Sequence, residues 1–389
     1  MMKKLIVLLF TVLMVSTPLQ LLAEENNNKV LDLNAKSVIL IERNTGEILY
    51  EENSDQQLPP ASMTKMMTML LIAEALDHGK ISLTETVRVS EHAASMGGSQ
   101  IFLEPNEEMT VEELLKAVAI GSANDASVAL AEHIAGSEQA FITMMNEKAT
   151  ELGLEQTMFK NTTGLPEQDH YSSAYDMAMI ARALLKYDFI TDYTSIYEDY
   201  LRKDSDNEFW LVNTNRLIKF YPGVDGLKTG FTQEAKYCLT ATALKNDMRL
   251  IAVVMGADTP KERNASITKL LDFGFSQFSH HLLHEGHEQV TEMDIIKGNK
   301  STVPLITQDA VSILTKKGEN LEQLETEIIL KENVVAPIEA GEVLGSLKVY
   351  LDGEIVNEVD LITEESVDRA SFLKLIKDST KQLLEIGKP

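Results

Sequence analysis

The feature that most constrains this chain is residues 60–65, Pro-Ala-Ser-Met-Thr-Lys, which lead directly into an apolar run over residues 66–73. Proline suits the first positions of a helix, so this stretch predicts a buried helix that opens at Ser62. Positions three apart share one helix face, so we expect Lys65 beside the Ser62 hydroxyl. A serine hydroxyl becomes a nucleophile when a neighbouring base takes its proton. A lysine is such a base only where burial or another cation keeps it neutral.

The Ser-x-x-Lys pattern is weak evidence by itself, because a chain of this length contains about one by chance. This sequence contains three, at residues 62–65, 266–269 and 371–374. The significance of the first therefore depends on the motifs that follow it.

A second motif, residues 121–125 (Gly-Ser-Ala-Asn-Asp), lies between two predicted helices. In such a loop Ser122 could relay a proton between Lys65 and a leaving group. Asn124 could hold Lys65 in place and bind a substrate amide. The alternative is that Ser122 or Asn124 only caps the next helix.

A third motif, residues 225–232 (Asp-Gly-Leu-Lys-Thr-Gly-Phe-Thr), precedes an apolar strand pattern. Lys228 and Thr229, placed at the start of a strand, could receive a carboxylate. Gly230 would let a bound peptide lie close to the strand backbone. The alternative is a surface turn. A literal Ser-Asp-Asn at residues 205–207 is set among charged residues and predicts a solvated loop.

Residues 1–23 are predicted to be a secretory signal peptide. Lys3 and Lys4 precede an apolar run over residues 5–15, which is too short to span a bilayer comfortably, and Ala23 offers a small residue for cleavage. The alternative is an uncleaved N-terminal anchor. The sequence therefore predicts an exported protein.

Cysteine content and charge limit what this protein uses for stability and binding. The single cysteine, Cys238, allows no internal disulfide, so the fold must rest on its hydrophobic core. We expect Cys238 itself to be a small buried apolar residue. The formal net charge of −25 argues against a nucleic-acid partner.

The order of patterns predicts two domains. Strand patterns at residues 37–50 and 239–255 enclose helical patterns at 110–185, which predicts an α+β domain over residues 24–280 with a sheet backed by a helical cluster. Residues 285–365 carry short alternating runs split by turn signals, typical of a small all-β domain.

Residues 367–389 predict an amphipathic helix. Its apolar residues fall on one side, and Lys374, Lys377 and Lys381 fall mainly on the other. Such a helix at the end of an acidic exported chain favours association with a membrane surface. The alternative is a helix that packs on its own domain.

Taken together, Ser-x-x-Lys, Ser-x-Asn and Lys-Thr-Gly, in this order, resemble the signature of serine penicillin-recognising enzymes. Four longer runs resemble the low-molecular-mass D-alanyl-D-alanine carboxypeptidases: residues 60–65, 122–126, 161–166 and 225–230. The resemblance to this family covers nearly the whole mature chain. Residues 336–341 are similar to the C-terminal β domain of that family. This chain departs from the family pattern at Ala123, usually glycine, and at Phe231, often histidine. The second departure is expected to affect substrate preference or deacylation.

The resemblance implies an α+β serine β-lactamase/transpeptidase-like domain, an antiparallel sheet with a helical cluster, followed by a small all-β domain and a C-terminal amphipathic helix. It implies that Ser62 attacks the peptide bond between the last two D-alanines of a peptidoglycan stem pentapeptide, that β-lactam antibiotics inhibit the enzyme, and that no metal or cofactor takes part. Backbone N–H groups of Ser62 and Phe231 would stabilise the oxyanion. The enzyme would act at the extracytoplasmic face of the cell membrane. The resemblance assigns catalysis to Ser62, Lys65, Ser122 and Asn124, and substrate binding to Lys228, Thr229, Gly230 and Phe231.

Three other functions compete with this interpretation. A β-lactamase shares the motifs, but those enzymes usually have one domain. A non-catalytic wall-binding protein could retain the fold, although the three intact motifs argue against it. A metalloprotein could use His280, His281, His284 and His287 on one side of a helix, but the His-Glu-x-x-His order is missing.

Overall fold

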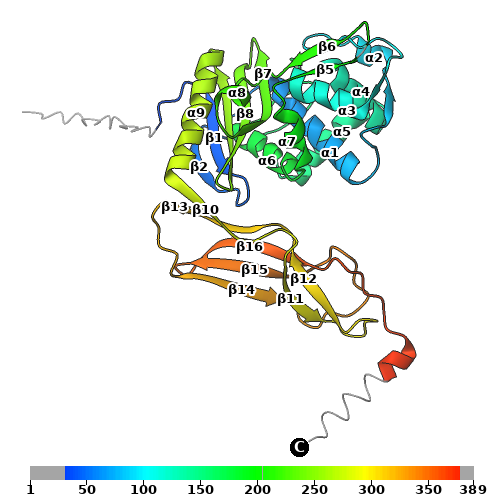
Figure 1. Cartoon of the computed structure of the whole chain (residues 1–389), viewed down its shortest axis with the longest axis vertical. Helices are drawn as coiled ribbons and strands as arrows, with labels where there is room; N and C mark the ends of the chain where they lie inside the picture. Colours follow the sequence, from blue (N-terminus) through cyan, green and yellow to red (C-terminus); the bar gives the residue numbers. More distant parts are fainter. Residues whose placement is uncertain (1–30, 204, 377–389) are drawn as a thin grey trace, which may run out of the picture. The chain divides into compact units, whose positions relative to one another are not determined.

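The computed structural model describes residues 31–203 and 205–376 of the chain. The predicted signal peptide lies outside the described residues, as does most of the predicted C-terminal helix. Within the described ranges, no helix combines the length and the apolar character needed to cross a membrane. Figure 1 shows an α+β N-terminal domain and an all-β C-terminal domain, so the predicted fold class and order are confirmed.

The N-terminal domain is built on an antiparallel sheet with the strand order β2-β1-β9-β8-β7. Its central strands are buried on both faces and are rich in branched apolar residues, as a covered sheet requires. Asn246 and Asp247 both hold positive φ between β8 and β9, the conformation of a two-residue hairpin turn. The strands of the sheet are β1 (Ser37–Glu42), β2 (Ile48–Glu52), β7 (Val224–Thr232), β8 (Lys236–Lys245) and β9 (Met248–Ala257).

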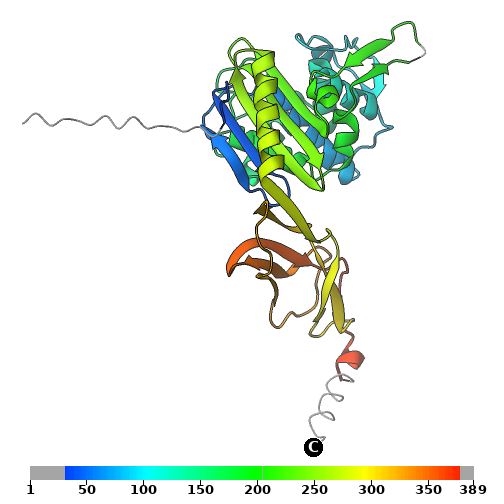
Figure 2. The same ribbon diagram turned by 60° about the vertical axis from the view of Figure 1, so that its left-hand side comes forward.

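Helices cover both faces of this sheet (Figure 2). Helix α9 packs so closely on one face that a Cβ at Gly274 would lie 2.5 Å from Leu250 Cδ1 and 3.0 Å from Leu40 Cδ2. The helical cluster covers the other face, where Ile39 and Ile251 enter the main core. The helices are α1 (Lys65–Asp77), α2 (Glu91–Ala94), α3 (Val111–Lys116), α4 (Asn124–Ala135), α5 (Glu138–Glu151), α6 (Ala174–Leu184), α7 (Phe189–Thr194), α8 (Leu217–Phe220) and α9 (Pro260–Gln277).

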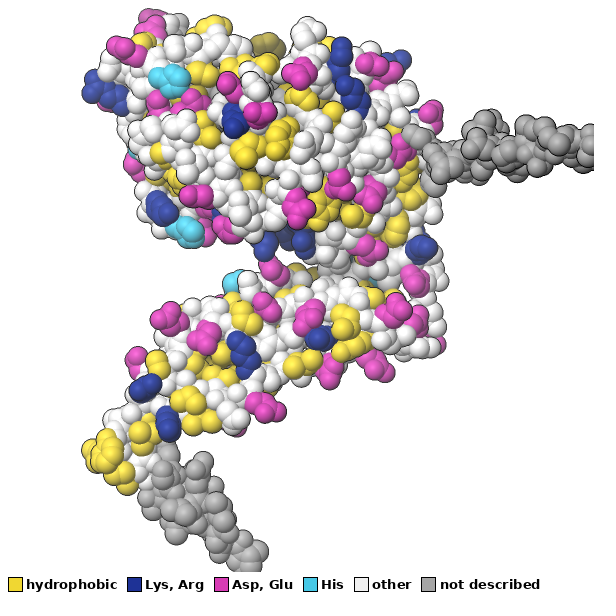
Figure 3. All heavy atoms as spheres, turned by 180° about the vertical axis from the view of Figure 1, so that it is seen from behind, with side chains coloured by type: hydrophobic (Ala, Val, Ile, Leu, Met, Phe, Trp, Pro, Cys, Tyr) yellow, Lys and Arg dark blue, Asp and Glu magenta, His cyan; other side chains and the backbone are white. Residues whose placement is uncertain are grey.

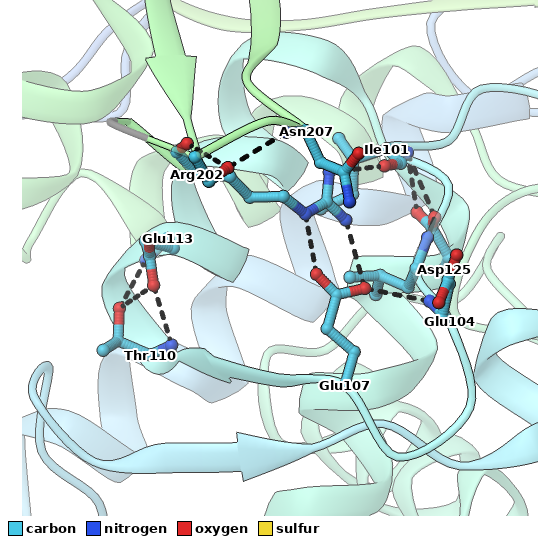
Figure 4. Close-up of polar contacts among 10 residues, drawn as sticks. Ile101, Glu104, Glu107, Thr110, Glu113, Asp125, Arg202 and Asn207 are labelled. Atoms are coloured by element: carbon cyan, nitrogen blue, oxygen red, sulfur yellow. Dashed lines mark hydrogen bonds and ion pairs between the residues drawn. The ribbon is translucent and has the colours of Figure 1, made fainter.

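Local signals in the sequence position several of these helices. The capping box at Thr110 and Glu113 is present, with the Thr110 hydroxyl accepting from Glu113 N at 3.2 Å and the Glu113 carboxylate accepting from Thr110 N at 3.0 Å (Figure 4). After α3 the chain continues as a π-helical turn, η2 (Ala117–Gly121), rather than as regular α-helix. Two short strand pairs flank the cluster: β3 (Thr86–Arg88) with β4 (Glu108–Thr110), and β5 (Glu198–Leu201) with β6 (Phe209–Val212).

The C-terminal domain consists of two antiparallel sheets around a separate apolar core. The cluster of four histidines that was considered on a helix lies instead on strand β10 and just beyond it, which corrects that expectation. Alternation of His280 and His281 along a strand points them to opposite faces. One sheet pairs β10 (Phe278–His284) with β13 (Val311–Lys316). The other sheet has the strand order β11 (Gln289–Asp294), β12 (Thr302–Thr307), β16 (Glu354–Ile362), β15 (Val343–Leu351) and β14 (Leu324–Leu330).

The C-terminal domain extends to about residue 370. Val367 and Ile338 exchange backbone hydrogen bonds of 2.9 and 3.0 Å, and Ala370 N donates to Lys297 O at 2.8 Å. A helical turn follows at residues 372–376, where Phe372 and Leu373 are exposed. Acidic side chains are spread over the face drawn in Figure 3 rather than gathered in one region, so the net negative charge is a general property of that face.

Candidate active site

The candidate nucleophile lies on a short 3-10 turn, η1 (Ala61–Thr64), and not on the regular helix that the sequence predicted. Helix α1 begins at Lys65. The spacing of three still brings the two side chains together, because residues three apart are also neighbours in a 3-10 turn. Lys65 Nζ lies 3.3 Å from Ser62 Oγ. Ala61, just before the nucleophile, has a φ of +47°, a left-handed conformation that costs a residue with a Cβ about 1 kcal/mol.

Lys65 is fully buried and held from three sides. Besides Ser62, its Nζ donates to Asn124 Oδ1 at 2.6 Å and to the Thr163 carbonyl at 2.7 Å. Burial and the positive charge of Lys228 place the pKa of Lys65 well below its usual range, against a smaller opposing effect of Asp125. These are the two conditions that the sequence analysis required of a lysine base, burial and a nearby cation.

The second motif lies at the junction of η2 and α4. Ser122 ends η2 with a φ of +62°, and Asn124 is the first residue of α4. The N-cap position is Ala123, which makes no side-chain cap, so the capping alternative for Ser122 and Asn124 is wrong. Asn124 Nδ2 donates to Gly97 O at 2.6 Å, so its amide is fixed with the oxygen toward Lys65. Among the described residues, Ser122 is not a hydrogen-bond partner of Lys65.

Asp125, next in this motif, anchors a neighbouring loop to it (Figure 4). Its buried carboxylate accepts from Ile101 N at 3.0 Å and from Leu103 N at 3.1 Å. On the other side of this loop, Arg202 donates to Ile101 O at 3.0 Å and pairs with Glu107 at 2.6 Å. The loop is thus fixed both to the Ser122 motif and to the β5–β6 hairpin.

The third motif lies within strand β7, not at the beginning of a strand as the sequence suggested. In the strand order β7 stands at one end of the sheet. Lys228 is buried, and its pKa is lowered to about 7 by burial and by the charge of Arg263. Thr229 Oγ1 donates to Thr214 Oγ1 at 2.7 Å. A lysine and a hydroxyl on a terminal strand suit a peptide that lies alongside it.

Gly230 and Phe231 complete this strand in different ways. A Cβ at Gly230 would lie 2.7 Å from Pro60 O and 3.1 Å from Ala61 Cβ. Glycine is therefore required so that β7 can approach η1, the turn that carries Ser62 and is called the nucleophile turn below. The sequence alone did not reveal this reason. The Phe231 side chain is 46% exposed and stacks on Tyr237 with ring centroids 4.4 Å apart.

The motifs named by the sequence analysis therefore meet at one place, but some of their partners were missed. The Thr163 carbonyl is a backbone atom and has no sequence signature. Arg263 lies on α9 without a motif of its own. Arg249 makes two hydrogen bonds of 2.8 and 2.9 Å to Asp225 and so ties β7 to β9. A signal for the last pair existed, because Asp225 opens the third motif.

Two other candidates from the sequence lie elsewhere. Residues 205–207, the literal Ser-Asp-Asn, are exposed at the end of the β5–β6 hairpin. Within residues 31–203 and 205–376 there is no group of three or more histidine, cysteine or acidic side chains placed to hold a metal ion. Cys238 is buried, and burial raises the pKa of its thiol to about 11.

Comparison with known proteins extends over both domains. The family model described as D-alanyl-D-alanine carboxypeptidase matches residues 23–259, and the model described as penicillin-binding protein 5, C-terminal domain, matches residues 278–369. The chain is 60% identical over 343 residues to D-alanyl-D-alanine carboxypeptidase DacF of Bacillus subtilis, covering 88% of each protein. It is 36% identical over 365 residues to DacC of Escherichia coli, covering 92% of this chain and 90% of that protein.

Solved structures agree with this relationship. Penicillin-binding protein 5 from Haemophilus influenzae superposes with a TM-score of 0.69 at 34% identity, covering 87% of this chain and 99% of that chain. Penicillin-binding protein D2 from Listeria monocytogenes, in its ampicillin-bound form, superposes with a TM-score of 0.57 at 31% identity, covering 63% of this chain and 99% of that chain.

Proposed function

The chain belongs to the D-alanyl-D-alanine carboxypeptidase family and is a serine carboxypeptidase of the penicillin-binding class, and on that premise we propose how its own residues perform the reaction. The substrate is a peptidoglycan stem pentapeptide that ends in D-Ala-D-Ala. The observation that carries the proposal is the set of contacts of Lys65. Its Nζ lies within reach of Ser62 Oγ, in a buried setting that lowers its pKa.

Acylation begins when Ser62 Oγ attacks the carbonyl carbon between the two D-alanines and Lys65 Nζ takes the hydroxyl proton. Backbone N–H groups of Ser62 and Phe231 stabilise the oxyanion. The C–N bond then breaks, and the proton returns through Ser122 to the departing amine. Asn124 keeps Lys65 aligned and binds the substrate amide. D-Alanine leaves, and the rest of the peptide stays on Ser62 as an ester.

Deacylation uses the same residues in reverse order. A water molecule gives a proton to Lys65 and attacks the ester carbon, the C–O bond to Ser62 breaks, and Ser62 Oγ takes the proton back from Lys65. The shortened peptide leaves with a new terminal carboxyl group. Before acylation, Lys228 and Thr229 bind the terminal carboxylate of the substrate. Gly230 and Phe231 present the strand edge along which the peptide lies. A β-lactam carries a comparable carboxylate and acylates the same serine.

The decisive experiment measures D-alanine release from a peptide that ends in D-Ala-D-Ala, with and without penicillin pre-treatment. We expect release that penicillin abolishes, with the penicillin label mapped to Ser62, and no release by Ser62→Ala. Absence of release with rapid loss of penicillin would favour a β-lactamase. Absence of both activities would favour a wall-binding protein.

The same proposal includes the location of the enzyme. The basic and apolar pattern of residues 1–23 supports export. The lysine-bearing pattern of the last residues supports attachment to the outer face of the cell membrane through an amphipathic helix. Truncation after Ala370 tests this, because it preserves the backbone hydrogen bonds of Val367 and Ala370. We expect the truncated protein to leave the membrane fraction with its carboxypeptidase activity intact, and a truncated protein that stays there contradicts the attachment.

A further inference from the structure

His170 is a buried histidine beside the nucleophile turn, and the proposed mechanism does not use it. Its side chain lies edge-on to Phe159, with ring centroids 5.9 Å apart, and only 7% of the residue is exposed. Nδ1 accepts from the backbone N–H of Lys160 at 3.1 Å, so this nitrogen carries no proton. The proton of the neutral ring is therefore on Nε2. Nε2 lies 2.8 Å from Thr64 Oγ1 and donates to it.

His170 ends a segment of the chain that contacts both η1 and α1. Residues 159–170 form a loop that is closed at its base, where Met158 and Tyr171 exchange backbone hydrogen bonds of 2.9 and 3.2 Å. Inside the loop the Thr163 carbonyl accepts from Lys65. The neighbouring Thr162 carbonyl accepts from Thr68 Oγ1 at 2.8 Å.

This segment, residues 159–170, thus meets η1 and α1 at Thr64, Lys65 and Thr68. Two of the three contacts end on backbone carbonyls of the segment, and the third is the His170 side chain. The segment and the nucleophile turn are closely packed, because Gly164 lies against the Ala61 carbonyl. A shift of the segment at His170 is therefore transmitted to the carbonyl that holds Lys65.

We propose that His170 is a positioning residue: its Nε2–H, bonded to Thr64, fixes the segment 159–170 so that the Thr163 carbonyl holds the Lys65 Nζ in line with Ser62. The inference rests on the proposed function, since it concerns how Lys65 is aligned for acylation. Among the described residues, His170 makes no hydrogen bond to Ser62 or Lys65. It acts through Thr64 and Thr163.

The ring is suited to this role because it stays neutral. Burial and the positive charge of Lys160 lower the pKa of His170 to about 4. Protonation would place a second N–H against the Lys160 N–H and break that contact. The charged groups that act on Lys65 itself are Lys228 from β7 and Asp125 from α4.

Two substitutions of His170 separate its two hydrogen bonds. The His170→Gln amide can place a donor near the former Nε2, so it can keep the bond to Thr64. The His170→Asn amide can place an acceptor near the former Nδ1, so it keeps the bond to Lys160 and loses Thr64. Thr64→Val removes the acceptor from the other side, and Thr64→Ser retains it. The four variants are compared by the second-order rate constant for acylation by a fluorescent penicillin, measured over a range of pH.

We expect His170→Asn and Thr64→Val to acylate about 10- to 100-fold more slowly than the wild type, since a misplacement of about 1 Å costs on this order. His170→Gln and Thr64→Ser should stay within about threefold. The acid limb of the pH profile should also move to lower pH in the two slow variants, because a carbonyl that accepts from Lys65 favours its charged form. Loosening of the fold alone would lower the rate without moving this limb.

Several results would overturn the inference. Wild-type acylation in His170→Asn or in Thr64→Val would do so, as would an equal loss in all four variants with an unmoved acid limb. Equal loss in His170→Gln and His170→Asn would show that the bond to Thr64 is not the one that matters. A wild-type protein that penicillin does not acylate would instead refute the proposed function, so the two failures are distinguishable.

Discussion

The close packing of Gly164 on the nucleophile turn makes Gly164→Ala a severe test of the site. A Cβ at this position would lie 1.8 Å from the Ala61 carbonyl oxygen, 2.3 Å from its carbon and 2.9 Å from Ser62 N. These are backbone atoms, so no side-chain rotation relieves the overlap. Bringing the first contact from 1.8 Å to an acceptable 3.0 Å requires the loop to retreat by about 1.2 Å.

The retreat would reach the catalytic lysine directly. Thr163 precedes Gly164, and its carbonyl accepts from Lys65 Nζ at 2.7 Å. Movement by more than 1 Å takes this contact out of hydrogen-bonding range, and a misplacement of that size costs on the order of 100-fold in rate. Gly164 also has a φ of +81°, where alanine costs about 1–2 kcal/mol of folding free energy. We therefore expect a loss of acylation much larger than the loss of stability explains.

Gly136→Ala is the matched control. Gly136 has the same φ of +81°, but a Cβ there would meet nothing within 4 Å. The two variants thus share the positive φ and differ in the contact with the nucleophile turn. The assays are the rate of acylation by a fluorescent penicillin and the free energy of unfolding in urea. An acylation rate of the Gly164→Ala protein within threefold of the Gly136→Ala rate would refute the reasoning.

Three further predictions concern charge. Because the pKa of Lys228 is about 7, a carboxylate ligand should bind more tightly as the pH falls through 7, where the ammonium form becomes dominant. Titration calorimetry at pH 6 and 8 measures this, and pH-independent affinity would contradict it. Because the pKa of His170 is lowered from 6.5 to about 4, the unfolded chain binds more protons between these values. Stability should therefore fall as the pH falls from 6.5 to 4, by up to about 3 kcal/mol. Urea unfolding of His170→Gln, which lacks this loss, isolates the contribution, and equal slopes in both proteins would refute it. Arg249→Ala should lower the free energy of unfolding by about 2 kcal/mol, since it leaves a half-buried carboxylate without its charged partner. Lys300→Ala, which removes an exposed ion pair, should change it by less than about 0.5 kcal/mol, and an equal effect of the two would contradict the burial argument.

Spacing along the chain was sufficient to predict the local geometry of the site. Ser62 and Lys65 meet because three residues make about one turn, and this holds even though the turn is 3-10 rather than α-helical. Helices α4 and α6 lie within the helical patterns expected at residues 110–185, because helical periodicity depends on neighbours in sequence. The capping box at Thr110 is equally local, because its two partners are three residues apart.

Contacts between residues far apart in the sequence could not be predicted from local sequence patterns. The Thr163 carbonyl lies 98 residues from Lys65 along the chain. Because it is a backbone atom, no residue type in the sequence predicts this hydrogen bond. Gly230 was explained by a bound peptide, whereas its place against Pro60 depends on how β7 meets the nucleophile turn. The four histidines were considered on a helix because spacings of three and four residues fit one helix face. Their location on β10 follows from pairing with β13, which the sequence does not reveal.

The two buried lysines give the site an electrostatic preference for chain ends. Burial lowers the pKa of both lysines, and a nearby cation lowers each pKa further: Lys228 acts on Lys65, and Arg263 acts on Lys228. A ligand with a free carboxylate favours the charged form of Lys228 and pairs with it, whereas an internal peptide bond or an amidated terminus brings no charge. Exopeptidase selectivity then needs no steric barrier at the end of the cleft. The site would favour the last residue of a chain because that residue alone carries the missing negative charge.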